Sequence, residues 1–184
     1  RDMLGVAEHL RGELAGVTFE LLGKARVLAE KTGGRVVAAL VGSGVQGFAA
    51  ALTLADSVAL VDHPSLLNFN PGPWLASLTA IMEKTAPRLT LVGNTSIGMD
   101  LAAALAVRRD LPLVAYATDL TVDGDDVVVK SQLYGGKILV ESVLKGGFGI
   151  VAVLAGSFPA DPGRRDGSPP VLAVPAPAGL EDGP

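Results

Sequence analysis

The order of apolar and polar positions along the chain changes character near residue 115. Before that point, short continuous runs of aliphatic residues alternate with longer segments in which apolar residues recur every three to four positions. Continuous aliphatic runs are typical of strands buried on both faces, and the longer spacing is typical of amphipathic helices. The predicted strands cover residues 3–7, 35–41, 57–61, 89–93 and 111–115. The predicted helices cover residues 18–32, 45–53, 74–85 and 97–108.

Strands that alternate with helices in this way indicate crossover connections and a parallel sheet. Because such crossovers are right-handed, we expect an α/β fold: a doubly wound, Rossmann-like sheet with helices on both faces. Thr18 is the expected N-cap of the first helix. Gly33 is the expected left-handed residue that ends it.

After residue 115 the helical spacing disappears. Strand-like runs cover residues 119–121, 127–133, 138–144 and 150–154, and Gly- and Asp-rich turns separate several of them. We expect these runs to form an antiparallel meander added to an edge of the parallel sheet.

The composition changes again from Pro159, where Pro, Gly and Asp become frequent. Such a segment has too little apolar surface to offset the entropy of ordering. The expected organisation is therefore one domain over residues 1–160 and a tail or linker over residues 161–184.

Composition and charge narrow the classes of function. The chain has no cysteine, which excludes disulfides, thiolate metal sites and cysteine nucleophiles. Its formal net charge is -4 and it has no basic cluster, so nucleic acid is not an expected partner. No apolar stretch reaches the roughly 18 residues of a membrane-spanning helix, and no signal-peptide pattern opens the chain. We expect a soluble, cytoplasmic protein with no membrane partner.

The junction after residues 89–93 carries the strongest local signal for ligand binding. Small polar residues lead there into a helix, whose N-terminus offers unpaired N–H groups and a partial positive charge. Thr95 or Ser96 would give a hydroxyl to a phosphate, Gly98 would allow close backbone approach, and Asp100 follows one turn later. These four residues are the candidate phosphate site of a nucleotide such as AMP. In the structural alternative, Ser96 is only an N-cap and Asp100 only offsets the helix dipole.

A second glycine motif follows the predicted strand at residues 35–41. Residues 42–47 have the GxGxxG spacing of a dinucleotide-binding turn, and Asp62 lies where a ribose-binding acid is expected. The motif follows the second predicted strand instead of the first, however, and this pattern alone has little specificity. A turn that merely requires glycine is the simpler interpretation.

A third motif, Tyr134, Gly135, Gly136 and Lys137, lies between two strands of the predicted meander. The glycines suit a tight hairpin. An exposed aromatic residue beside a cation also suits a contact with a partner subunit. Both interpretations stand on the sequence.

The chain has two histidines, His9 and His63. Neither has a second His, Asp or Glu at the spacing of a metal site or a catalytic triad. We therefore expect a domain that binds or scaffolds and performs no group transfer of its own.

Several of these segments together resemble the alpha subunit of electron transfer flavoproteins. The matching segments are residues 18–25 (TFELLGKA), 94–102 (NTSIGMDLA), 134–137 (YGGK) and 151–160 (VAVLAGSFPA). The resemblance implies an adenine nucleotide alpha hydrolase-like fold. It also implies a heterodimer with a beta-type subunit, in a complex that passes electrons from dehydrogenases to an acceptor.

The same resemblance implies that FAD belongs mainly to a separate C-terminal domain. Nothing after Phe158 resembles the FAD loops of that domain, so we expect no FAD on this chain alone. Leu154 stands where the family usually has Arg, and any contact of that arginine with the flavin or the partner would be lost here. We also expect that the chain can form a homodimer in the absence of its partner.

These observations leave two functions of different class. The first is a non-catalytic scaffold domain of an electron transfer flavoprotein, which contacts the beta-type subunit through residues 134–137. The second is a stand-alone adenine-nucleotide-binding domain that uses Thr95, Ser96 and Gly98. An NAD-dependent oxidoreductase using residues 42–47 would need a catalytic acid for which the sequence offers no candidate.

Overall fold

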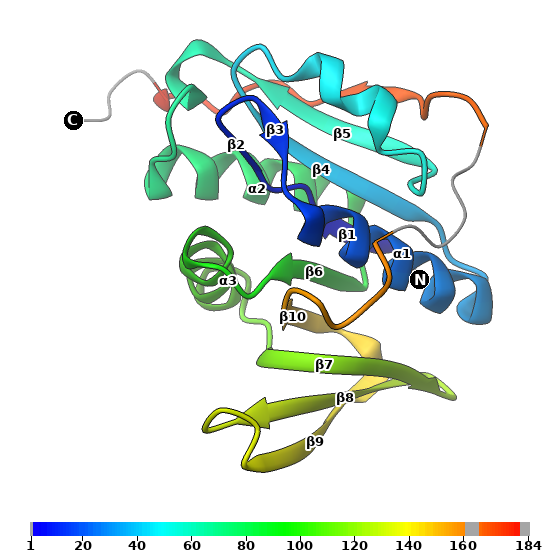
Figure 1. Cartoon of the computed structure of the whole chain (residues 1–184). Coiled ribbons are helices and arrows are strands. Elements are labelled where there is room, and N and C mark those ends of the chain that lie inside the picture. Colours follow the sequence, from blue (N-terminus) through cyan, green and yellow to red (C-terminus); the bar gives the residue numbers. More distant parts are fainter. Residues whose placement is uncertain (1, 161–165, 181–184) are drawn as a thin grey trace.

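The computed structural model describes residues 2–160 and 166–180, and its central element is a nine-stranded sheet (Figure 1). The strand order is β11-β5-β4-β1-β6-β10-β7-β8-β9. The strands are β1 (Met3–Val6), β4 (Val36–Gly42), β5 (Ser57–Asp62), β6 (Leu89–Gly93), β7 (Leu113–Asp123), β8 (Asp126–Leu133), β9 (Ile138–Leu144), β10 (Gly149–Val153) and β11 (Val171–Ala173). A separate two-stranded hairpin pairs β2 (His9–Leu10) with β3 (Glu13–Leu14).

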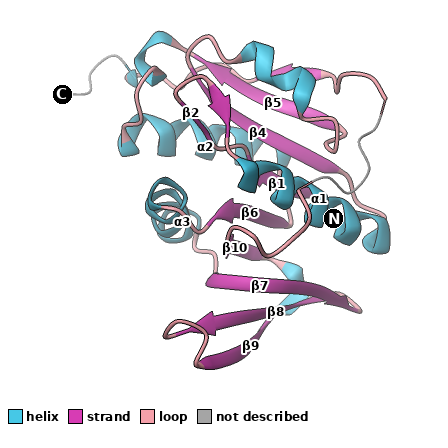
Figure 2. Ribbon diagram, viewed as in Figure 1, coloured by secondary structure: helices cyan, strands magenta, loops and turns pink. Residues whose placement is uncertain are grey.

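Helices cover both faces of the sheet (Figure 2). They are α1 (Gly16–Thr32), α2 (Pro71–Thr85) and α3 (Ser96–Arg109), with short 3-10 turns η1 (Gln46–Ala51), η2 (Pro64–Leu66) and η3 (Lys145–Gly147). Leu21 and Leu28 of α1 belong to the core on one face, whereas Leu78 of α2 and Leu101 of α3 belong to the core on the other. The strands from β11 to β7 in the sheet order are parallel, which confirms the α/β, Rossmann-like prediction.

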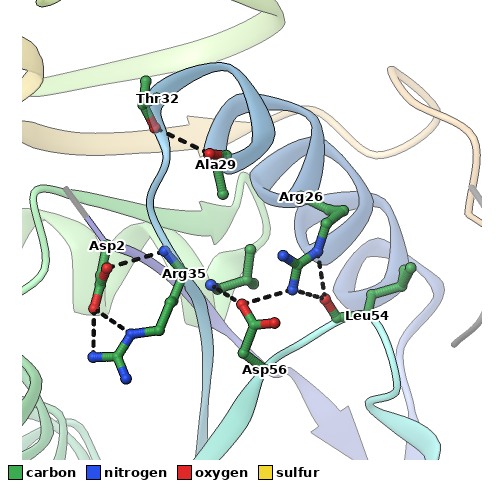
Figure 3. Close-up of polar contacts among 8 residues, drawn as sticks. Asp2, Arg26, Ala29, Thr32, Arg35, Leu54 and Asp56 are labelled. Atoms are coloured by element: carbon green, nitrogen blue, oxygen red, sulfur yellow. Dashed lines mark hydrogen bonds and ion pairs between the residues drawn. The ribbon is translucent and has the colours of Figure 1, made fainter.

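Ion pairs fix the amino ends of the central strands (Figure 3). Asp2, before β1, binds the Arg35 guanidinium at 3.0 Å. Partial burial raises the pKa of Asp2, but the hydrogen bonds and charge of Arg35 outweigh this effect and hold the pKa below its usual value. The buried Arg26 of α1 binds Asp56 at 2.8 Å, and Asp56 also accepts from the Val36 backbone N–H at 2.7 Å. Helix α1 is therefore tied to the starts of β4 and β5.

The prediction of Thr18 as the N-cap of α1 is wrong, because the helix begins at Gly16 and Ala15 is the capping residue. The Thr18 hydroxyl instead accepts from the Glu8 N–H at 2.9 Å and donates to the Glu8 carbonyl at 3.0 Å, which joins the helix to the end of β1. At the other end, Gly33 is left-handed with φ 66°, as predicted.

The predicted meander is partly wrong. β7–β8 and β8–β9 are antiparallel as expected, but β10 lies between β6 and β7 and runs parallel to both. All five residues of β10 are buried, because this strand has helices or other core elements on both of its faces. The two runs predicted at residues 111–115 and 119–121 are one bulged strand, β7.

The expectation that the C-terminal segment lacks order is wrong for part of it. Val171–Ala173 forms β11, which pairs with β5 at the edge of the sheet, and Val174 and Leu180 are buried. Two apolar anchors and a short backbone ladder order this segment despite its many prolines. Residues 161–165 and 181–184 of the predicted tail lie outside the described residues, and the domain boundary at residue 160 remains a prediction.

Candidate functional site

In open α/β sheets, ligands bind beyond the carboxyl ends of the strands, where the strand order reverses. Here α1 leads from β1 to β4 on one side, whereas α2 returns the chain to β6 on the other side of β1. The reversal therefore lies between β1 and β6. Glu8 follows β1 and Thr95 follows β6, so these two side chains lie at the position where a ligand is expected.

At this position the N-terminus of α3 contacts a carboxylate of the chain itself. Thr95, not Ser96, is the N-cap: its hydroxyl accepts from the Gly98 N–H at 2.9 Å and donates to Glu8 Oε2 at 2.7 Å. The Glu8 carboxylate thus lies near the positive end of α3, which stabilises the helix by about 0.3–1 kcal/mol.

Of the other three candidate phosphate residues, only Gly98 donates a hydrogen bond to the Thr95 side chain. Ser96 and Asp100 are exposed, whereas Gly98 is buried. A Cβ at Gly98 would collide with the carbonyl oxygen of Gly93, so the close packing of α3 on β6 already explains this glycine. The structure therefore brings together Thr95 and Gly98. A nucleotide at this site stays a prediction.

The turn of residues 42–47 also binds a carboxylate. The backbone N–H groups of Gly44 and Val45 donate to Asp62 at 2.8 and 3.1 Å. Gly44 has φ 67°, which explains one glycine of the motif by its backbone conformation. The predicted ribose-binding acid, Asp62, is therefore the acceptor for the N–H groups that a pyrophosphate would use.

A third carboxylate, which the sequence analysis missed, lies beyond the end of β10. Glu20 of α1 is only 7% exposed and accepts from the N–H groups of Gly156, at 2.9 and 3.0 Å, and Phe158, at 3.2 Å. A buried carboxylate requires such partners. The one sequence signal for this buried carboxylate is that Glu20 stands directly before Leu21, on the apolar face of the predicted helix.

The same region carries an ion pair between α1 and the sheet. Lys24 binds Asp119 of β7 at 2.9 Å and lies 4.7 Å from the centre of the Phe158 ring. Partial burial raises the pKa of Asp119, but the hydrogen bond and charge of Lys24 outweigh it and hold this pKa below its usual value.

Residues 134–137 form the turn of the β8–β9 hairpin, and all four are exposed. Tyr134, Gly135 and Gly136 have φ of 52°, 66° and 86°. The Gly136 N–H donates to the Leu133 carbonyl at 3.1 Å, which closes the turn. The hairpin is therefore present, and a left-handed tyrosine at its start is uncommon.

Tyr134 lies at the edge of a hollow of about 530 Å³, which we call the tyrosine hollow. Its lining residues are Tyr116, Gln132, Leu133, Tyr134, Gly135, Gly136 and Leu154. Tyr116 is also left-handed, with φ 56°, because β7 bulges there and the Asn94 side chain accepts from the Tyr116 N–H at 2.9 Å. Leu154 contributes an apolar side chain to the lining.

The described parts of the chain contain neither a candidate metal cluster nor a helix suited to cross a membrane. Among residues 2–160 and 166–180, no cluster of three or more His, Asp or Glu side chains is arranged to hold a metal ion. None of the helices that the structure describes has the length and apolar character that a membrane crossing requires.

Comparison with known proteins gives one consistent family. Residues 3–178 match the model of the electron transfer flavoprotein domain. The chain is 33% identical over 142 residues to the electron transfer flavoprotein subunit alpha of Thermoanaerobacterium thermosaccharolyticum, covering 76% of this chain and 43% of the relative. It is 35% identical to the subunit of the same name from Megasphaera elsdenii, covering 75% and 42%.

A further relative is a subunit of the lactate dehydrogenase (NAD(+),ferredoxin) of Acetobacterium woodii, 36% identical over 78% of this chain and 35% of the relative. The chain thus spans about two-fifths of the length of the relatives that it matches.

Proposed function

Because the chain belongs to the electron transfer flavoprotein family and is related to its alpha subunits, we propose that it is the N-terminal scaffold domain of an alpha-type subunit. In this proposal it pairs with a beta-type subunit, through residues 134–137 and the tyrosine hollow. The complex transfers electrons from dehydrogenases through FAD that other parts of it hold.

The observation that carries the proposal is the exposed apolar surface around the tyrosine hollow. Tyr134 is 76% exposed and Tyr116 is about half exposed, and both line the hollow. Ile138 and Leu139 follow the turn in β9 and are also exposed, on opposite faces of that strand. Clustered exposed apolar side chains mark protein contacts, and tyrosine is enriched in them. A left-handed backbone at a tyrosine costs of order 1 kcal/mol or more. Because the Tyr134 side chain is exposed, this cost supports a role for Tyr134 in contacting a partner.

The carboxyl edge of the sheet supports a scaffold in place of a cofactor site. The pyrophosphate of FAD requires free N–H groups or cations. The N–H groups of Gly44 and Gly156 bind Asp62 and Glu20, and Thr95 binds Glu8. These occupied groups leave fewer donors for the pyrophosphate of FAD at this edge, which supports the scaffold proposal.

The experiment is co-purification with a beta-type subunit of the same organism. We expect a 1:1 complex, and Tyr134→Asp is expected to weaken it at least about thirtyfold, the effect of losing about 2 kcal/mol at an interface hot spot. The matched control is Val107→Asp on α3, where the native valine is 86% exposed and distant in sequence from the hairpin. Equal affinities of the two variants would contradict the proposed interface.

The second candidate, a stand-alone AMP-binding domain at Thr95, Ser96, Gly98 and Asp100, would place a phosphate near Glu8. We expect binding only if the Glu8 carboxylate moves away from Thr95, since like charges repel. Isothermal titration of the chain and of Ser96→Ala with AMP tests it. Binding that weakens in the variant supports this candidate, and no heat in either protein removes it.

A further inference from the structure

A second cavity, distinct from the tyrosine hollow, opens at the carboxyl edge of the sheet. It has a volume of about 660 Å³, within the range of small-molecule sites, and it shares no lining residue with the tyrosine hollow. It lies beside the β2–β3 hairpin, the Gly44 turn and the start of α2. Nothing in the proposed function uses it. We call it the aromatic pocket.

Four rings from separate segments form a continuous wall of this pocket. The His9 ring lies 5.5 Å from both the Phe48 and the Trp74 rings, measured between centroids, and Phe69 lies 5.5 Å from Trp74. These separations are typical of stacked and edge-on aromatic pairs. Trp74 is almost fully buried, so the wall is packed in position. A wall of ring faces and edges favours a flat ligand.

His9 gives this wall one polar group of defined character. Its Nε2 lies 2.7 Å from the Val41 carbonyl oxygen, and a carbonyl only accepts, so Nε2 carries the proton. In the neutral ring Nδ1 is then an acceptor. No described residue donates to Nδ1, and it is not among the buried atoms that lack partners. His9 lines the pocket, so Nδ1 is the acceptor that a ligand bound there could use.

The polar groups around the pocket disfavour phosphate. Gly44 lines it, and the N–H groups of Gly44 and Val45 already donate to the Asp62 carboxylate. A phosphate at this turn would meet that negative charge, and the N–H groups of Gly44 and Val45 are already occupied. Arg11, a cation of the lining, and Asp62 are both exposed, so water screens both charges and the occupied N–H groups decide against phosphate.

We propose that the aromatic pocket binds a flat, uncharged nitrogen heterocycle with an N–H donor: a nucleobase, free or as its nucleoside, and not a nucleotide. The rings contact the faces and edges of the base, and its amino group donates to His9 Nδ1. Asp62 discriminates against ligands that carry phosphate.

Trp74 is the single tryptophan of the chain, so its fluorescence reports on the pocket directly. We expect adenosine to change this fluorescence saturably. Purine riboside, which lacks the amino group, is expected to bind about five- to tenfold more weakly, the effect of one neutral hydrogen bond. AMP is expected to bind at least about tenfold more weakly than adenosine, because its phosphate would meet Asp62 and N–H groups that are already occupied.

Two variants assign these differences to residues. His9→Phe keeps the ring and removes the acceptor, so adenosine and purine riboside should bind equally. Asp62→Asn should bring AMP close to adenosine, and Tyr134→Asp, at the tyrosine hollow, should change nothing. Thermal unfolding checks that each variant folds. If His9→Phe does not fold, Phe69→Leu replaces it. Phe69→Leu removes one ring of the wall and should weaken adenosine binding.

Three results would overturn the proposal: no fluorescence change at millimolar adenosine, tighter binding of AMP than of adenosine, or an unchanged preference for adenosine in a folded His9→Phe protein. None of these depends on whether the chain pairs with a beta-type subunit.

Discussion

The clearest quantitative consequence of the structure concerns Glu20. The side chain is 7% exposed and satisfies the N–H groups of Gly156 and Phe158. A hydrogen bond to a charged partner contributes about 1.5–3 kcal/mol. Gly156 is exposed, so water replaces its partner in Glu20→Ala, whereas Phe158 is half-buried and loses its partner more completely. We therefore expect a loss of about 2–4 kcal/mol in the free energy of unfolding.

Urea unfolding followed by the fluorescence of Trp74 measures this loss. Glu30→Ala is the matched control, because Glu30 lies on the same helix and is exposed; its effect should stay within about 0.5 kcal/mol. Glu20→Gln keeps one acceptor oxygen, so its loss in the free energy of unfolding should lie between those of Glu20→Ala and Glu30→Ala. A Glu20→Ala protein as stable as the control would refute the role of this carboxylate.

Two further predictions follow from particular contacts. The pKa of Asp119 is lowered in the folded protein, so the stability from its pairing with Lys24 is present at neutral pH. This stability is lost as the pH falls below about 4, through the folded pKa. Asp119→Asn should therefore flatten the acid limb of a plot of stability against pH, and an unchanged limb would contradict this. Gly98→Ala would drive its Cβ into the Gly93 carbonyl and should lower the free energy of unfolding by about 2–3 kcal/mol in a denaturant titration. Ser96→Ala, at an exposed position of the same helix turn, should lower it by less than about 1 kcal/mol. Equal losses would contradict the packing of Gly98 against Gly93.

The elements that the sequence predicted well are those whose signal is local. Each of the five parallel strands predicted before residue 115 is present, because runs such as residues 36–41 are aliphatic throughout and become buried on both faces. The strand β10 is equally aliphatic, and the same rule applies to it. Its neighbours in sequence are antiparallel strands, which favours placing it in the meander, whereas its neighbours in the sheet, β6 and β7, are not its nearest in the chain.

The site was harder to predict because its partners are distant in the chain. The cap formed by Thr95 and Gly98 spans three residues, and the sequence indicated its place. The bond from Thr95 to Glu8 spans 87 residues, and the bond from Gly156 to Glu20 spans 136. No local pattern shows that a carboxylate comes to lie against a turn that far away. The tyrosine hollow likewise required the bulge in β7 that brings Tyr116 beside the hairpin.

A scaffold domain that pairs with a beta-type subunit and holds no flavin itself has a definite mass, alone and in the complex. Native mass spectrometry of the purified chain, alone and mixed with that subunit, measures both. We predict the bare mass of the chain when it is alone, as monomer or dimer, and a 1:1 complex in the mixture. An FAD-sized addition on the chain alone, or two unassociated proteins in the mixture, would contradict the scaffold proposal.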